Sequence, residues 1–413
     1  MIRIRQRFEP SSRIDIPREI RTQVERMEIN KIVTPGQTVA IACGSRGVAN
    51  LAEIIRSVAM VLGELGLEPF IVPAMGSHGG ATAEGQQKVL ECLGVSHETV
   101  GVPIRSSMEV VQIGETDDSI PVYVDKLAHE ADFIVPINRI KKHTDFEYEL
   151  ESGLMKLLTI GLGKQKGAEL YHQAVFQLGF PRVIFSVARR ILENTNVLFG
   201  VGVIEDAFAQ TAAVSVVRPE ELEDREKELL RISKTMTPGL PFEDVDILII
   251  DEMGKEISGA GFDTKVVGRI GLPLKTEEPK SPRIKRIIVC DLTDESEGNA
   301  AGVSNSDFIT RRLYEKIDKD VTMVNCLTSC DPEAIKIPLP MESDRSAIEM
   351  AAQCVGMISA QELKVMRIKN TLHLYEVEVS VAYEEELRNR ADIEVIGEAK
   401  TMSFDEQGNL AQF

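Results

Sequence analysis

The chain has 413 residues, of which 43% are hydrophobic and 27% are charged, and its formal net charge at pH 7 is −18. This length exceeds what a single hydrophobic core usually supports, so two domains are expected. The acidic charge repels nucleic acid phosphates, and no basic stripe interleaved with aromatic residues offsets it. The first residues lack the apolar stretch of a signal peptide, and no run of about 18 apolar residues occurs. We therefore expect a cytoplasmic protein that binds neither nucleic acid nor membranes.

The six cysteines are scattered along the chain, which does not indicate a disulfide framework. Only Cys326 and Cys330 lie close together. A single C-x3-C pair without a nearby histidine or further cysteine is more often structural than metal-binding.

Short apolar strands alternate with amphipathic helices in the first half of the chain. Apolar residues recur at helical spacing in 49–66 and in 181–194, and Thr82 is a helix start signal. Strands rich in Val and Ile that alternate with helices are typical of a mostly parallel sheet covered on both faces. The expected strands of this first series are 38–43, 69–75, 132–138 and 197–205.

A highly charged helical stretch ends at Pro238-Gly239-Leu240-Pro241, and a second αβ series begins after it. We therefore predict an α/β protein with two αβ domains, residues 1–240 and 241–413. Mostly parallel sheets and an active-site cleft between the domains are expected.

Three of the predicted strands end in short polar or glycine-rich loops, at 43–47, 75–80 and 137–143. Sites in parallel αβ sheets lie outside the carboxyl ends of the strands. An arginine at position 46 can clamp a carboxylate or phosphate, and the imidazoles of His78 and His143 suit proton transfer at neutral pH. Either histidine taken alone is more often a surface loop residue, and a functional site is expected because the three loops are predicted to meet at one edge of the sheet.

Four residues in a fixed order, His78, His143, Lys156 and His172, resemble the nickel-dependent lactate racemase family, as does the GSRG loop after the first strand. The resemblance covers about residues 45–205. Cys43 and Gly47 depart from the family pattern, which has an acidic residue and a proline there.

The resemblance implies a cofactor, the nickel-pincer nucleotide, which is a pyridinium mononucleotide that carries sulfur donors. Lys156 would be its covalent attachment point and His172 its nickel ligand, and a square-planar nickel site suits sulfur and imidazole donors. The resemblance further implies the following roles: His78 and His143 as the acid/base pair, Arg46 as the residue that holds the substrate, Ser45 and Gly163 as cofactor contacts, and Lys265 and Arg269 as substitutes for the family's carboxylate-binding residues.

The implied function is that of an isomerase, a racemase or epimerase of a small 2-hydroxy acid that uses hydride transfer to the cofactor. One imidazole on each face of the planar keto intermediate can exchange the hydroxyl proton of either enantiomer. Two other functions stay open: a non-catalytic small-ligand-binding protein, and an iron-sulfur-associated electron-transfer protein, although the cysteines form no cluster-binding run. The oligomeric state also stays open, and a homo-oligomer is among the options.

Overall fold

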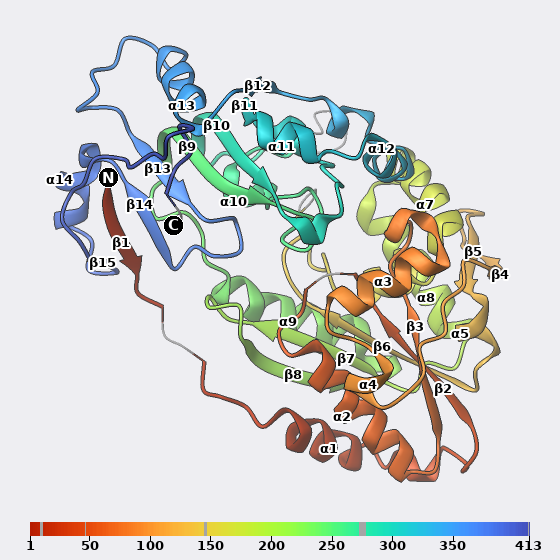
Figure 1. Cartoon of the computed structure of the whole chain (residues 1–413). Coiled ribbons are helices and arrows are strands. Elements are labelled where there is room, and N and C mark those ends of the chain that lie inside the picture. Colours follow the sequence, from red (N-terminus) through yellow and green to blue (C-terminus); the bar gives the residue numbers. More distant parts are fainter. Residues whose placement is uncertain (9–10, 46, 144–146, 272–277, 412) are drawn as a thin grey trace.

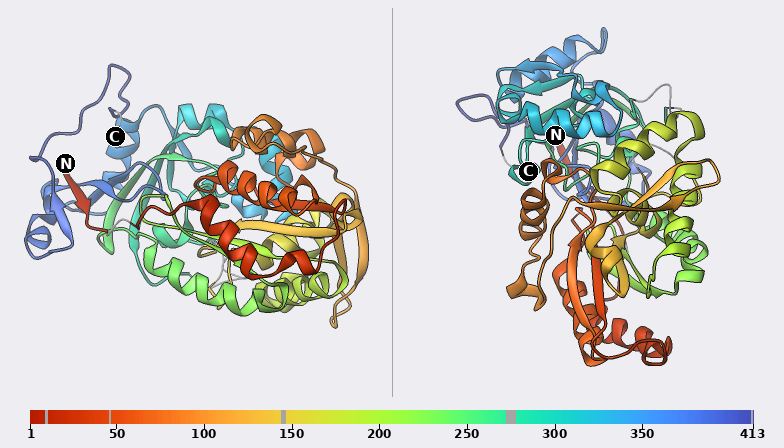
Figure 2. Two further views of the ribbon diagram at one scale, coloured as in Figure 1. Left: turned by 90° about the horizontal axis from the view of Figure 1, so that it is seen from below. Right: turned by 90° about the vertical axis from the view of Figure 1, so that its right-hand side faces the viewer.

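The computed structural model describes the chain except residues 9–10, 46, 144–146, 272–277 and 412. Two β-sheets covered by helices make up most of the molecule (Figure 1). Figure 2 shows the early residues, coloured red to yellow, mainly at one end and the later residues, cyan to blue, at the other. The predicted α/β class with mostly parallel sheets is confirmed.

The first sheet has five strands in the order β3-β2-β6-β7-β8. Neighbouring strands are parallel from β3 to β7, and only β8 is antiparallel to its neighbour. Every residue of β2 from Val39 to Cys43 is buried, which explains its uninterrupted apolar sequence. The strands are β2 (Thr38–Cys43), β3 (Glu68–Pro73), β6 (Phe133–Arg139), β7 (Gly200–Glu205) and β8 (Thr211–Val217).

Helices cover both faces of this sheet. Val39 and Ile41 of β2 belong to the same apolar cluster as helices α1 and α2, whereas Ala40 and Ala42 belong to the cluster that includes α8. The helix predicted after Thr82 is α3, and the Thr82 hydroxyl accepts a hydrogen bond from the backbone N–H of Gly85. The helices of this part are α1 (Ile16–Arg26), α2 (Leu51–Glu64), α3 (Ala83–Cys92), α4 (His97–Val100), α5 (Lys126–Glu130), α6 (Leu154–Lys156), α7 (Lys164–Leu178), α8 (Phe180–Asn194) and α9 (Leu222–Met236).

The second sheet has eight strands in the order β12-β11-β10-β9-β13-β14-β1-β15. The pairs from β12 to β13 are parallel, and the last three pairs are antiparallel. The segment 319–328 within the second αβ series is a helix, α12. The strands are β9 (Asp244–Met253), β10 (Arg283–Leu292), β11 (Phe308–Thr310), β12 (Leu339–Met341), β13 (Val365–Ile368), β14 (Glu376–Val379) and β15 (Ile393–Val395), with helices α10 (Thr264–Val267), α11 (Arg311–Lys316), α12 (Lys319–Thr328), α13 (Asp344–Gln353) and α14 (Glu384–Arg388).

The first strand of the chain, β1 (Ile2–Gln6), pairs with β14 and β15 in this second sheet, and Figure 1 shows it in red beside the blue strands. Ile2 and Ile4 alternate with exposed or half-buried arginines and join the core under the second sheet. The predicted division at residue 240 stays a prediction, but these N-terminal residues lie with the later part of the chain. A two-stranded hairpin of β4 (Val110–Glu115) and β5 (Pro121–Asp125) completes the strands described.

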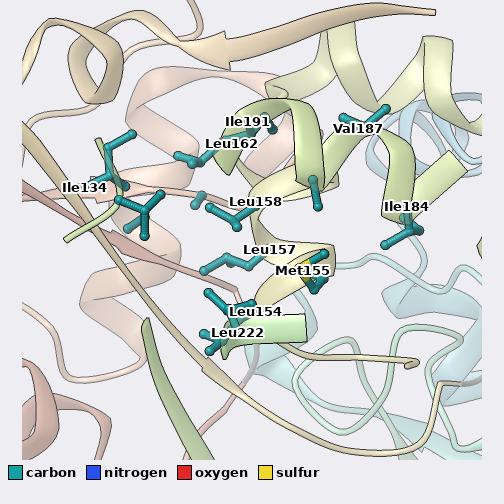
Figure 3. Close-up of a cluster of buried hydrophobic side chains, with 14 of the residues drawn as sticks. Ile134, Leu154, Met155, Leu157, Leu158, Leu162, Ile184, Val187, Ile191 and Leu222 are labelled. Atoms are coloured by element: carbon teal, nitrogen blue, oxygen red, sulfur yellow. The ribbon is translucent and has the colours of Figure 1, made fainter. Parts of the chain in front are cut away.

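The segment 154–162 lies in the core beside the first sheet. Its apolar side chains pack with Ile184, Val187 and Ile191 of α8 and with Leu222 of α9 (Figure 3). Lys156 lies within this segment and is half-buried, whereas its neighbours Met155 and Leu157 are buried. The core thus fixes the backbone on both sides of one lysine.

None of the helices in the described residues is long and apolar enough to cross a membrane.

Candidate functional site

A cavity of about 1360 Å³, including its opening to solvent, lies at the carboxyl ends of β2, β3 and β6. Because these three strands are parallel neighbours, their loops meet at one edge, as predicted. Loops of the second sheet close the other side of the cavity. The second sheet's lining residues include Lys255, Gly259 and Ala260 after β9, Ala301, Gly302, Ser304 and Asn305 after β10, and Asn325 and Ser329 on or beside α12.

His78, His143, Lys156 and His172 all line this cavity. They come from the loop after β3, the loop after β6, the end of α6 and the middle of α7. The chain separates the first from the last by more than 90 residues, so the fold brings the predicted set together.

His78 is held at both its ring and its backbone. Its Nδ1 is hydrogen-bonded to the hydroxyl of Ser45, which follows β2. The Gln86 side-chain amide donates to the carbonyls of Gly76, at 2.8 Å, and of His78, at 3.2 Å. Gly76 has φ 60° and lies against the carbonyl of Ile160, so a side chain there would be strained.

A buried lysine supports Gln86. The ammonium of Lys164 donates to Gln86 Oε1 at 2.9 Å, lies 3.1 Å from Asp125 Oδ2, and also donates to the Pro73 carbonyl at the end of β3. Burial lowers the pKa of Lys164, and the Asp125 carboxylate opposes this effect. Lys164 therefore ties the end of β3 to α3 and positions the loop that carries His78.

His143 and Lys156 are in direct contact, with the lysine Nζ hydrogen-bonded to His143 Nε2. The His143 side chain is buried, and its backbone N–H donates to Glu151 Oε2 at 2.6 Å. Lys156 is the last residue of α6, and the next five residues, Leu157–Gly161, form a π-helix. Such single π turns are rare and frequently occur at functional sites.

The ring of Phe180 lies near both His143 and His172 on this side of the cavity. Its ring centroid lies 5.7 Å from that of His143 and 6.0 Å from that of His172, the latter in an edge-on arrangement. Phe180 begins α8 after Gly179, which has φ 78°. Phe180 was not among the residues predicted from the sequence, although its position after a glycine and before Pro181 marked a helix start.

The buried carboxylate of Glu151 binds two lysines and the backbone of His143. It accepts from Lys234 Nζ at 2.6 Å, from Lys265 Nζ at 3.0 Å and from the His143 backbone N–H. Lys234 lies on α9 and Lys265 on α10, so the carboxylate connects the loop of His143 to the second sheet's side of the molecule.

We predict that Glu151→Gln lowers the free energy of unfolding by roughly 3 kcal/mol, because two lysines lose their shared buried partner. Urea unfolding measures this change. Glu147→Gln is the matched control: Glu147 is exposed and lies 3.8 Å from the same Lys234, so its loss should cost under about 1 kcal/mol. Equal effects of the two substitutions would contradict the role of Glu151.

Glu226, on α9, supports the short helix that carries Lys156. Its Oε2 accepts a hydrogen bond from the Met155 backbone N–H at 3.0 Å. A Cβ atom at Gly153 would lie 2.2 Å from Glu226 Oε1, so the approach requires glycine. Burial raises the pKa of Glu226 to about 7.

The raised pKa of Glu226 determines how the stability of the folded protein changes with pH. Between about pH 4.5 and 7 the folded chain keeps a proton on Glu226 that the unfolded chain releases, so stability falls as pH rises through this window. We predict that the free energy of unfolding of the wild type falls by up to about 3 kcal/mol between pH 5 and pH 8, and that Glu226→Gln removes this fall. Urea unfolding near pH 5 and pH 8 measures both proteins. Glu223→Gln is the control: the Arg189 hydrogen bond lowers the pKa of Glu223, so its titration lies below this window. An unchanged pH dependence in Glu226→Gln would contradict the prediction.

Two of the remaining predicted site residues, Lys265 and Arg269, do not line the cavity. Arg46 lies outside the described residues. Lys265 binds Glu151, and Arg269 binds Asp307 at 2.8 Å together with three backbone carbonyls; neither is among the residues that line the cavity. Lys255 is the lysine that the second sheet's loops place at the cavity.

Two further predicted positions are explained by packing. A Cβ atom at Gly163 would lie 2.7 Å from the Thr159 carbonyl and 3.0 Å from the Tyr171 ring, so close packing accounts for this glycine. Gly161, two residues earlier, lines the cavity instead. Cys43, which departs from the resemblance, is fully buried under α2, and burial raises the pKa of its thiol.

Residues 6–179 match the family described as the lactate racemase N-terminal domain. No protein of curated function matches the chain.

Two solved structures share the fold. One is the lactate racemase apoprotein from Thermoanaerobacterium thermosaccharolyticum, with a TM-score of 0.53 and 14% identity over 90% of this chain and 99% of that one. The other is a protein from Thermotoga maritima, with a TM-score of 0.52 and 15% identity over 89% of this chain and 99% of that one. Residues 6–179 thus match the lactate racemase N-terminal domain family, and the chain shares the fold of the lactate racemase apoprotein over 90% of its length.

Proposed function

We propose that this protein is an isomerase, a racemase or epimerase of a small 2-hydroxy acid. The observation that carries the proposal is that His78, His143, Lys156 and His172 line one cavity at the carboxyl edge of the first sheet. The match to the lactate racemase N-terminal domain supports the same reaction class.

The charge of the cavity suits an anionic substrate. Besides Lys156, which would carry the cofactor, its described lining includes Lys141, Lys142 and Lys255 but a single carboxylate, Asp331, in a chain whose net charge is −18. A concentration of positive charge in a cleft raises the local concentration of anions. We assign the substrate carboxylate to this lysine-rich lining.

The residues present fit the nickel-pincer nucleotide. Lys156 would carry it through its amine and His172 would supply an imidazole donor. Among the described residues, no group of three or more His, Cys, Asp or Glu side chains is arranged to hold a metal ion, so a metal at His172 needs donors from its own ligand. When bound, the nucleotide supplies nickel and a hydride acceptor, which avoids forming a carbanion next to a carboxylate.

The protein's own part is proton transfer at the substrate hydroxyl. The Ser45 contact at Nδ1 holds the His78 ring in place, and we assign the proton exchange to its Nε2. His143 is held by the Glu151 contact to its backbone and by Phe180 against its ring. Two histidines whose orientations are fixed by different elements can serve the two enantiomers in turn.

Chiral chromatography tests the proposal. Protein made in cells that produce the cofactor is incubated with single enantiomers of a panel of 2-hydroxy acids, including lactate. We expect the opposite configuration at C2 to appear for at least one acid until equilibrium is reached. Protein that carries the cofactor in full yet inverts none of the panel would favour a non-catalytic binding role.

A further inference from the structure

One side chain of α3 binds the backbone of the loop that carries His78. Gln86 is fully buried, and its amide donates to the Gly76 carbonyl at 2.8 Å and to the His78 carbonyl at 3.2 Å. Its Oε1 accepts from Lys164 Nζ at 2.9 Å. The amide therefore acts as a donor toward the loop and as an acceptor toward Lys164, which an aliphatic side chain at this position could not do.

The lysine that binds Gln86 occupies a costly position. Lys164 is fully buried, and its backbone has φ 52°, a left-handed conformation that few residues other than glycine adopt. Its ammonium also contacts the Pro73 carbonyl and the carboxylate of Asp125, which is itself fully buried. Backbone strain of this kind clusters at functional sites, and a buried ion pair adds little net stability compared with apolar side chains. The arrangement therefore favours a role in placing groups accurately over a role in stability.

The direction of the Gln86 amide follows from the chemistry of its partners. A lysine ammonium only donates and a carbonyl oxygen only accepts, so the amide oxygen has to face Lys164 and the NH₂ group has to face the two loop carbonyls. Lys164 thus selects the orientation of the amide that binds the loop.

Gln86 and its partners do not touch the space in which a substrate would lie. Neither Gln86 nor Lys164 nor Asp125 is among the described residues that line the main cavity, whereas His78 is. Ser45 holds the ring of His78 at Nδ1, and Gln86 holds its backbone. A catalytic group that is misplaced by about 1 Å can lose about a hundredfold in rate, even when the altered residue is remote from the chemistry.

We infer that Gln86 is a positioning residue for proton transfer at His78, and that Lys164 keeps its amide turned toward the loop. The inference rests on the proposed function, because it gives Gln86 a part in the same reaction. It goes beyond support of the fold, since the expected loss is in the rate of the bound substrate and in the environment of one imidazole.

Gln86→Glu separates the two contacts of this side chain. A carboxylate still accepts from Lys164 but has no N–H group for the loop carbonyls. In protein made in cells that produce the cofactor, we expect kcat for the acid that the wild type inverts to fall about 10- to 100-fold, with KM within about twofold and the cofactor mass increment unchanged. Gln87→Glu is the matched control, because Gln87 is the next residue of α3 and is exposed, so both constants should equal those of the wild type.

A second readout does not depend on turnover. In protein labelled with ¹⁵N-histidine, the ring signals of His78 are assigned by their absence in His78→Gln. We expect these signals to shift in Gln86→Glu and to stay at their wild-type positions in Gln87→Glu. The signals of His97, which begins α4 and does not line the cavity, should be the same in the wild type and in both Glu variants.

A lower kcat together with shifted His78 signals supports the inference. Unmoved His78 signals or a wild-type kcat in Gln86→Glu would overturn it. Loss of the mass increment, or a shift of the His97 signals as well, would assign Gln86 a general structural role and would overturn it too.

Failure of the proposed function gives a different result. If the wild type inverts no acid, that function fails, and the His78 signals alone decide whether Gln86 positions the ring. If Gln86→Glu does not fold, Gln86→Asn takes its place, because its amide is one methylene too short to reach Lys164 and both loop carbonyls together. The same fall in kcat and the same shift are then expected, and their absence contradicts the inference.

Discussion

Lys156→Ala should abolish turnover, with a fall in kcat of at least about 10⁴-fold, because the proposed cofactor, which would carry the hydride chemistry, would lose its covalent attachment. The substitution removes an amine that contacts His143 but leaves the buried neighbours Met155 and Leu157 in place. We therefore expect the unfolding temperature to change little. The measurement is initial rate by chiral chromatography, together with the intact mass of each variant.

Lys166→Ala is the control for this prediction. Lys166 lies on α7, the helix that also carries His172, and its ammonium stacks 4.3 Å from the Tyr123 ring centroid, but it is not among the residues that line the cavity. Its loss should leave the cofactor attached and the rate close to that of the wild type. Full activity in Lys156→Ala would show that Lys156 takes no part in the reaction.

His78→Gln and His143→Gln should each lower kcat by roughly 10²–10⁴-fold, which is the usual contribution of a general acid or base. Each glutamine keeps a polar group near the site but cannot exchange a proton at neutral pH. Each histidine would serve one face of the substrate, so every inversion would use both residues. We therefore expect each variant to slow the reaction in both directions, from either enantiomer. Chiral chromatography that starts from each enantiomer in turn gives the two rates for each of the two variants.

His97→Gln controls for a general effect of histidine loss, because His97 begins the short helix α4 and does not line the cavity. The cofactor adduct should persist in all three variants. A histidine variant that keeps wild-type kcat would exclude that residue as an acid/base group, and one that loses the adduct would point to a role in holding the cofactor.

Much of the site followed from local sequence patterns. Apolar strands that end in Gly/Ser or Lys/His loops predicted that 43–47, 75–80 and 137–143 meet at one sheet edge, and the parallel order β3-β2-β6 confirms it. This prediction was possible because strand direction and handedness fix which loops share an edge. The positions of Lys156 and His172 in the same cavity came from the family resemblance, since nothing in their local spacing specifies where α6 and α7 pack.

The supporting residues could not be predicted, because each depends on a contact across the chain. Glu226 reaches Met155 from 71 positions away, and Lys164 reaches Pro73 from 91 positions away. The same limit applies to the second sheet's side of the cavity. The family resemblance implied Lys265 and Arg269 as substitutes for its carboxylate-binding residues, whereas the fold uses them in ion pairs with Glu151 and Asp307. The direction of a side chain such as that of Lys265 on α10 is set by tertiary packing, which a sequence pattern does not report.

Lys156 is proposed to carry a tethered nickel cofactor beside three histidines. The most direct test compares the intact mass and nickel content of protein from cells with and without the pincer-cofactor pathway. We expect a mass increment equal to the cofactor, with nickel approaching one atom per chain, only in cells that have the pathway, and peptide mapping should place the increment on Lys156. Protein from those cells that carries neither the increment nor nickel would contradict the account.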